Sequence, residues 1–174
     1  DIVAAVIAHE LRLIAVLTGE RAPDNPVAFA EFAARFAHRY ADTVDVYQIW
    51  DEPNLQTGWG DTPSVASYSR LLAASHEAIH QADASSTVLL AGLAPTVETG
   101  PDNISDLLFL RQLYAVGAAP FFDAAAGKPY AFNTAPDERS PHPKKLNFSR
   151  FILLRAEMER AGDEAKLLWG SHFG

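Results

Sequence analysis

The stretch Val44-Asp45-Val46-Tyr47-Gln48-Ile49-Trp50-Asp51-Glu52-Pro53-Asn54 (residues 44–54) is an apolar run that ends at two carboxyl groups and a proline. Side chains alternate between the two faces of a strand, which predicts that Gln48, Trp50 and Glu52 share one face. Pro53 lacks a backbone donor and favours extended geometry at Glu52. The stretch therefore predicts a buried strand that presents Glu52 at its carboxyl end.

Strand-like and helix-like segments alternate along the whole chain, a pattern typical of a parallel sheet with crossover helices. The strands are predicted at residues 12–17, 44–50, 87–93, 121–126 and 166–170. Five strands are too few for a closed (β/α)8 barrel, which takes about 250 residues. We therefore expect residues 1–174 to form a single, partial barrel domain, with the remainder of the barrel supplied by flanking sequence.

Four residues mark helix boundaries. Asn25 and Thr62 each precede a proline and offer a side-chain oxygen to the first turn of a helix. Gly117 and Gly162 fall where crossover helices should end, because glycine enters the left-handed conformation at low cost. The predicted helix at residues 63–83 carries a stripe that would cover a sheet. This stripe comprises Tyr68, Leu71, Ser75, Ile79 and Ala82.

Small residues at alternate positions of the fourth predicted strand, Ala124 and Ala126, suit the crowded interior of a barrel. A doubly wound open sheet would show a similar pattern. Glu52 lies at the carboxyl end of its strand, which is where barrel enzymes place their catalytic groups.

Composition excludes several classes of function. The hydrophobic content of 48% is enough for one core, and the net charge of −8 leaves no basic stripe for nucleic acid. The chain has no cysteine, which excludes disulfides and thiolate zinc sites but leaves the cellular compartment open. No apolar run of about 18 residues predicts a membrane segment. We expect no nucleic-acid partner, no cofactor and no metal.

Residues 47–54 resemble the strand-four motif of clan A glycoside hydrolases, usually Trp-Asn-Glu-Pro. Residues 168–174, Leu-Trp-Gly-Ser-His-Phe-Gly, are similar to the strand-seven motif Trp-x-Thr-Glu-Phe-Gly of the same clan. The resemblance implies a TIM (β/α)8 barrel of the glycosidase type that acts on O-glycosidic bonds of an oligo- or polysaccharide. It also implies that Glu52 is the general acid/base.

Three positions depart from the clan pattern. His172 stands at the nucleophile position, Asp51 replaces the asparagine before the acid/base, and Lys128 stands where a strand-six histidine is common. Retaining glycosidases need two carboxyl groups about 5–5.5 Å apart. We expect the negative charge of Asp51 to be balanced by Lys128 or His172. The candidate catalytic residues are Glu52, Asp51 and His172.

Three interpretations remain open. The first is a hydrolase that pairs Glu52 with an unusual partner, such as Asp51 in an inverting reaction or a carboxylate outside this stretch. The second is a catalytically inactive, carbohydrate-binding relative of the glycosidases. The third is another chemistry on the same fold, because fold does not dictate function.

Further residues are candidates for lining a sugar cleft. Trp59 lies in a Gly-Trp-Gly loop and is expected either to stack on a sugar ring or to pack beneath its own backbone. Tyr130 has the same strand parity as Lys128, and the resemblance implies a hydrogen bond to His172; a core position is the alternative. The candidate substrate-binding residues are Trp50, Asn54, Trp59, Lys128 and Tyr130.

The segment His76-Glu77-Ala78-Ile79-His80 matches the zinc-protease motif H-E-x-x-H. Helical geometry leaves His76 at the margin of the apolar stripe and Glu77 nearly opposite it. A catalytic zinc needs a third protein ligand, and the only candidate nearby is Glu98 in the next loop. We therefore do not expect a metalloprotease site.

Overall fold

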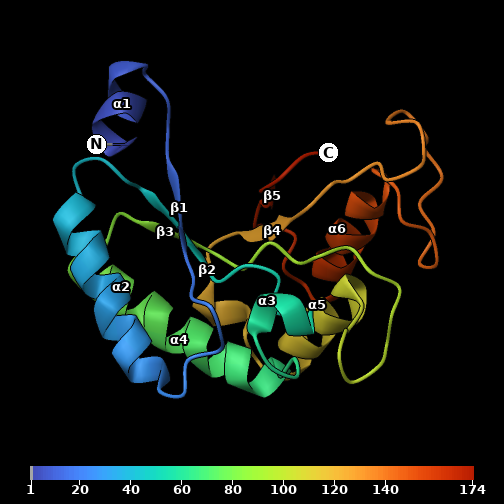
Figure 1. The fold of residues 1–174 in the computed structure, drawn as a ribbon, viewed down its shortest axis with the longest axis horizontal. Helices are drawn as coiled ribbons and strands as arrows, with labels where there is room; N and C mark the ends of the chain where they lie inside the picture. The colour runs from blue at the N-terminus through green and yellow to red at the C-terminus, as the bar shows by residue number, and fades with distance from the viewer. Residues whose placement is uncertain (1) are drawn as a thin grey trace.

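The computed structural model describes residues 2–174, so Asp1 lies outside the described residues (Figure 1). Helices and strands alternate as the sequence predicts. The helices are α1 (Ile2–Ala8), α2 (Pro26–Tyr40), α3 (Gln56–Trp59), α4 (Val65–Ala82), α5 (Asp106–Ala115) and α6 (Arg150–Arg160), with a 3₁₀ helix η1 (Ala119–Phe121). The strands are β1 (Ile14–Leu17), β2 (Val46–Ile49), β3 (Thr87–Leu89), β4 (Ala125–Gly127) and β5 (Leu168–Gly170).

All strand pairs are parallel and follow the order of the chain. One sheet has the order β1-β2-β3, and β4 pairs with β5. Isolated parallel bridges from Leu89 to Ala124 and from Leu93 to Gly127 connect β3 to β4. The five strands therefore form one interrupted, parallel wall, as expected for part of a barrel.

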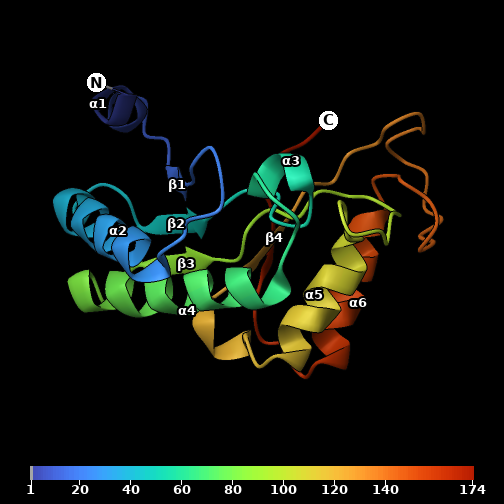
Figure 2. The ribbon, with the colours of Figure 1, turned by 60° about the horizontal axis from the view of Figure 1, so that its bottom comes forward.

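Helices α2, α4, α5 and α6 cover one side of this wall (Figure 2). Figure 2 shows α2 and α4 side by side beneath β1–β3, with α5 and α6 further along. The main core fills this layer, and the predicted stripe of α4 faces it: Tyr68, Leu71, Ser75 and Ile79 are buried. On the opposite face, a small cluster contains Val46, Leu89 and Ala124. This face corresponds to the barrel interior. The position of Ala124 on it agrees with the prediction from the small residues of the fourth strand.

Most of the predicted boundaries are confirmed. The Asn25 side chain accepts hydrogen bonds from the backbone at the start of α2. Gly117 and Gly162 lie just after α5 and α6 with φ of 80° and 75°, in the left-handed region. The predicted cap at Thr62 is wrong: Ser64 caps α4, and its hydroxyl accepts from the backbone nitrogen of Ser67.

The fourth strand is shorter than predicted. Residues 119–121 form η1 around Pro120, which sets a helical φ and lacks a backbone donor for a ladder. The strand begins only at Ala125. In the described part of the chain, no helix has the length and apolar character needed to cross a membrane.

Candidate functional site

The backbone leaves its extended conformation immediately after β2. Trp50 has φ of 69° and Glu52 has φ of 49°, which places both in the left-handed region. The predicted extended geometry at Glu52 is therefore wrong, although Pro53 follows it. Asp51, between them, forms a parallel bridge with Gly92 after β3. Left-handed backbone at large residues costs free energy and is concentrated at functional sites.

The left-handed turn sends Trp50 into the core instead of the barrel interior. Its side chain is 1% exposed, its ring lies 5.8 Å from that of Phe29 on α2, and its indole nitrogen donates to the carbonyl of Gly58. Gln48 donates from its side-chain amide to the Asp51 carboxylate. The prediction that Gln48, Trp50 and Glu52 share a face is therefore wrong, and Trp50, which is expected to bind substrate, lies in the core.

The centre of the site is an ion cluster at the carboxyl ends of the strands. Lys128, just after β4, donates from Nζ to Asp51 Oδ2 at 2.8 Å and to Glu52 Oε1 at 2.7 Å. Burial acts to lower the pKa of Lys128, but the hydrogen bonds and negative charges of Asp51 and Glu52 outweigh it and raise the pKa. The ammonium is therefore charged at neutral pH and holds both carboxylates, which are only about 30% exposed. Of the two cations expected to balance Asp51, it is Lys128 that forms the ion pair.

His172 lies apart from this cluster. The ring is exposed, and its Nδ1 is 3.4 Å from Ser171 Oγ. Ser171 in turn donates its backbone nitrogen to the carbonyl of Gly127 at the end of β4. Within residues 2–174, no hydrogen bond or ion pair joins His172 to Asp51 or Glu52. The position expected for a nucleophile therefore carries a solvent-facing imidazole next to the mouth.

Two other expected substrate contacts are structural. Asn54 is fully buried, and its amide nitrogen donates to the carbonyls of Ala94 and Ile104 while its oxygen accepts from the nitrogen of Ala94. Trp59 is 3% exposed and packs edge-on against Trp50. The burial of Asn54 and Trp59 gives both side chains a structural role, and for Trp59 it favours the alternative of packing within the protein.

Tyr130 lies at the mouth but not where the resemblance implies. Its ring is half-buried, 5.9 Å from that of Phe132, and its backbone nitrogen donates to the carbonyl of Lys128. In the described chain, no hydrogen bond connects its hydroxyl to His172. Tyr130 therefore remains a candidate for lining the cleft through its ring.

Tyr68 lies on α4 and contacts the ends of two strands that carry the site, whereas the sequence predicts only that it belongs to an apolar stripe. Its hydroxyl donates to the carbonyl of Ile49, the last residue of β2, at 3.0 Å. The same oxygen accepts from the backbone nitrogen of Ala91, just after β3, at 2.8 Å. Burial raises the pKa of Tyr68, so the hydroxyl keeps its proton. A tyrosine at the centre of a buried stripe was the available signal, since its hydroxyl needs partners there.

Gly92 allows the cluster to close. A Cβ at this position would lie 2.4 Å from Ser171 Oγ and 3.3 Å from Asp51 Oδ1 and Lys128 Cε. Gly92→Ala is therefore expected to displace the ion cluster and to reduce activity or sugar affinity, by up to the order of 10²-fold if the groups move by about 1 Å. Ligand titration combined with circular dichroism checks this. Gly100→Ala is the control, because nothing lies within 4 Å of its added Cβ; an equal loss in both variants would contradict the assignment.

Comparison with solved structures identifies the architecture. A glucosidase from Croceicoccus marinus superposes over 99% of this chain with a TM-score of 0.74 at 16% identity. A family 39 glycoside hydrolase from Bacteroides cellulosilyticus gives a TM-score of 0.72 over 99% of the chain, also at 16% identity. The chain has the fold of part of a (β/α)8 barrel, similar to the barrels of these proteins.

A β-xylosidase from Caulobacter crescentus agrees with this partial barrel, with a TM-score of 0.70 over 98% of the chain at 17% identity. The chain spans 36%, 38% and 39% of these three structures, respectively. No protein-family model matches the sequence, and no curated protein matches it. The likeness at this identity establishes the fold and leaves the chemistry to the residues of the site.

Proposed function

We propose that residues 1–174 form one partial-barrel domain that contributes a carbohydrate site. In this site, Glu52 acts as the general acid/base in hydrolysis of an O-glycosidic bond in an oligo- or polysaccharide. The observation that carries the proposal is the position of Glu52. It follows β2 of a glycosidase-type barrel, at the carboxyl end of the strand, and its carboxyl group is partly exposed at the mouth.

The surroundings of Glu52 support a role in proton transfer. The left-handed backbone and the bond to Lys128 hold the carboxyl group in one place, as a catalyst must be held. Catalysis as an acid requires Glu52 Oε1 to exchange the ammonium of Lys128 for the glycosidic oxygen. A sugar hydroxyl bound by Lys128 or Asp51 would favour that exchange.

A second function, carbohydrate binding without turnover, is favoured by two observations. His172 at the nucleophile position cannot supply a carboxylate. Lys128 already donates a hydrogen bond to Glu52 Oε1, the oxygen proposed to transfer the proton. Asp51 is a poor substitute for the missing group. Its oxygen and that of Glu52 share one ammonium, so they lie closer than the roughly 6.5–9.5 Å that separates the carboxyls of inverting enzymes.

The two functions are separated by turnover. The full-length protein is tested for release of chromophore from a panel of aryl glycosides and, in parallel, for binding of oligosaccharides by calorimetry. Release that depends on Glu52 supports hydrolysis. Binding with no release across the panel contradicts hydrolysis and supports the binding function, and neither binding nor release contradicts both.

His172→Glu is expected to create retaining hydrolysis, because it places a second carboxyl group just after β5, at the position that the resemblance to the clan assigns to the nucleophile. The product anomer, followed by nuclear magnetic resonance early in the reaction, measures the stereochemistry. His172→Gln is the matched control, since it has similar size and no carboxylate. Equal rates in the two variants would contradict a productive geometry at residue 172.

A further inference from the structure

We propose that His76, His80 and Asp123 bind a divalent transition-metal ion, with Zn²⁺ as the best fit, and that this ion ties α4 to the start of β4. The proposal concerns a second site, at the amino-terminal end of β4. It is independent of the carbohydrate site, which lies at the carboxyl ends of the strands. The sequence offers only Glu98 as a third ligand beside His76 and His80. In the structure, Glu98 accepts a hydrogen bond from Asn103, and Asp123 lies near the two histidines instead.

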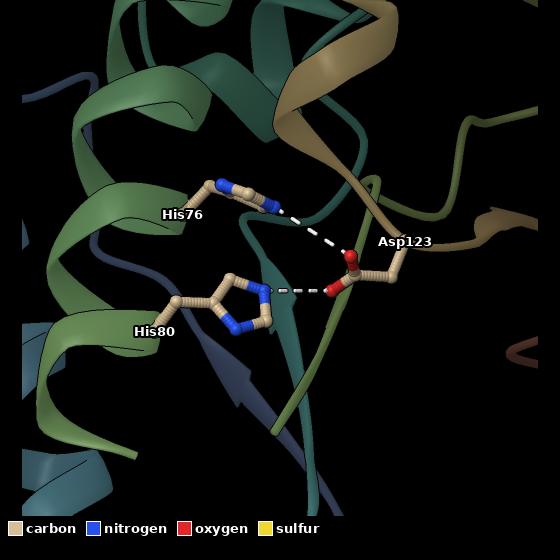
Figure 3. Close-up of side chains that lie close together, drawn as sticks. All are labelled: His76, His80 and Asp123. Atoms are coloured by element: carbon tan, nitrogen blue, oxygen red, sulfur yellow. Dashed lines mark hydrogen bonds and ion pairs between the residues drawn. The ribbon is translucent and has the colours of Figure 1, made fainter. Parts of the chain in front are cut away.

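Three donor groups from two segments converge here. His76 and His80 are one turn apart on α4, with ring centroids 4.4 Å from each other. Asp123 lies between η1 and β4, and its Oδ1 and Oδ2 are 3.6 Å and 3.0 Å from Nε2 of His76 and His80. Figure 3 shows both imidazole nitrogens directed at the carboxylate. One donor atom from each residue falls within 4.8 Å of the others.

These distances suit a small cation. Zinc bonds of about 2.0–2.1 Å to nitrogen and oxygen place tetrahedral ligands roughly 3.3 Å apart, between the two values observed. Two imidazoles and one carboxylate are donors that zinc prefers, and imidazole suits other late first-row ions as well. The partial exposure of all three side chains leaves solvent access for entry of the ion and for a water ligand.

The carboxylate is also oriented by the fold. Asp123 Oδ2 accepts a hydrogen bond of 2.7 Å from the backbone nitrogen of Val88 on β3. Hydrogen bonds of this kind to a ligand fix its direction and strengthen metal sites. The ring of Phe121 in η1 lies 6.4 Å from that of His76, so an apolar group closes one side. Asp123 therefore presents its oxygens to α4 before any ion arrives.

The role of this ion is structural and not proteolytic. Glu77, the residue that acts as the base in H-E-x-x-H proteases, is exposed and lines a surface hollow with Glu31 of α2, away from Asp123. A general base must lie within hydrogen-bond reach of the metal-bound water. The site instead joins an outer helix to a strand, where an ion stabilises the folded state by mass action.

Calorimetric titration of Zn²⁺ into untagged, chelator-treated protein tests the proposal, with Co²⁺ absorption as a second readout. One equivalent is expected to bind and, at about 100 times Kd, to raise Tm by roughly 5–10 °C. His76→Ala and His80→Ala should each weaken binding by at least tenfold, and Asp123→Asn should do the same. His38→Ala, in an exposed histidine of α2, and Glu77→Gln should bind as the parent does.

Two results would overturn the proposal. One is the absence of stoichiometric binding by the folded parent protein. The other is binding that survives in both His76→Ala and His80→Ala, which would place the ion elsewhere. The two histidine variants remove only partly exposed side chains, so folding is expected to persist, and circular dichroism verifies it.

Discussion

Glu52→Gln is expected to reduce hydrolysis of aryl glycosides by about 10²–10⁴-fold in kcat/KM, the usual contribution of a general acid/base. Glutamine has nearly the same shape and can still accept a hydrogen bond from Lys128 at Oε1. It cannot give or take a proton. Initial rates of chromophore release from the full-length protein measure the loss, while oligosaccharide affinity is expected to change little.

The leaving group sharpens this test. A poor leaving group, such as an alkyl alcohol, needs protonation as it departs, whereas a nitrophenolate departs without it. The loss in Glu52→Gln should therefore be greater for the poorer leaving group. Glu31→Gln, on an exposed part of α2, is the matched control and should retain full activity. Equal losses for both leaving groups would contradict the role of Glu52 as an acid.

Arg150→Met is expected to lower the free energy of unfolding by about 3–5 kcal/mol, the typical cost of leaving one member of a buried ion pair alone. Arg150 is 2% exposed and donates from Nε and Nη2 to the carboxylate of Asp106. Its remaining donors bond to the carbonyls of Thr96, Pro143 and Lys145. One guanidinium thus joins α5, α6 and two loops.

The ionisation of Asp106 shows why removal is costly. Burial raises the pKa of Asp106 in spite of the hydrogen bonds and charge of Arg150. Without Arg150, the buried carboxyl group loses the cation that pairs with it and must be desolvated alone or take up a proton. The pair is therefore expected to matter mainly through the penalty of separating it, and less through a net gain over apolar residues.

Urea denaturation at constant m measures the effect of Arg150→Met. Arg70→Met is the control, because Arg70 is exposed and bonds only to the hydroxyl of Ser67 among the described side chains; it should fall within about ±0.5 kcal/mol. Asp106→Leu combined with Arg150→Met should recover part of the loss, since no lone charge remains. A loss below about 1 kcal/mol in Arg150→Met would contradict the structural role.

Local sequence signals predicted the elements of the fold because they act over short distances. The alternating apolar residues of 44–50 predicted β2, and a side-chain oxygen before a proline predicted the cap at Asn25. The same rule failed at Thr62, since the helix there starts two residues beyond Pro63, at Val65. The strand predicted at residues 121–126 starts too early, because Pro120 supports a 3₁₀ turn that ends at Phe121. These errors concern boundaries and leave the architecture unchanged.

The site was harder to predict because it depends on contacts between distant residues. The alternation of side chains along a strand predicts an extended Trp50, but tertiary packing with Phe29 and Trp59 favours a left-handed turn that sends the indole to the core. The sequence predicts that Lys128 lies at the mouth. Its simultaneous bonds to Asp51 and Glu52 could not be predicted, because they depend on how the ends of β2 and β4 are arranged in space.

Tyr68 connects the helix layer of this barrel to two of its strands. The hydroxyl joins the ends of β2 and β3 from an outer helix, in addition to the backbone bridge between Asp51 and Gly92. The bridge between Asp51 and Gly92 is made by the backbone, so these connections do not depend on the side chains at the mouth. Substitution of the side chains of Asp51, Lys128 and His172 is therefore expected to leave the alignment of β2 and β3 intact.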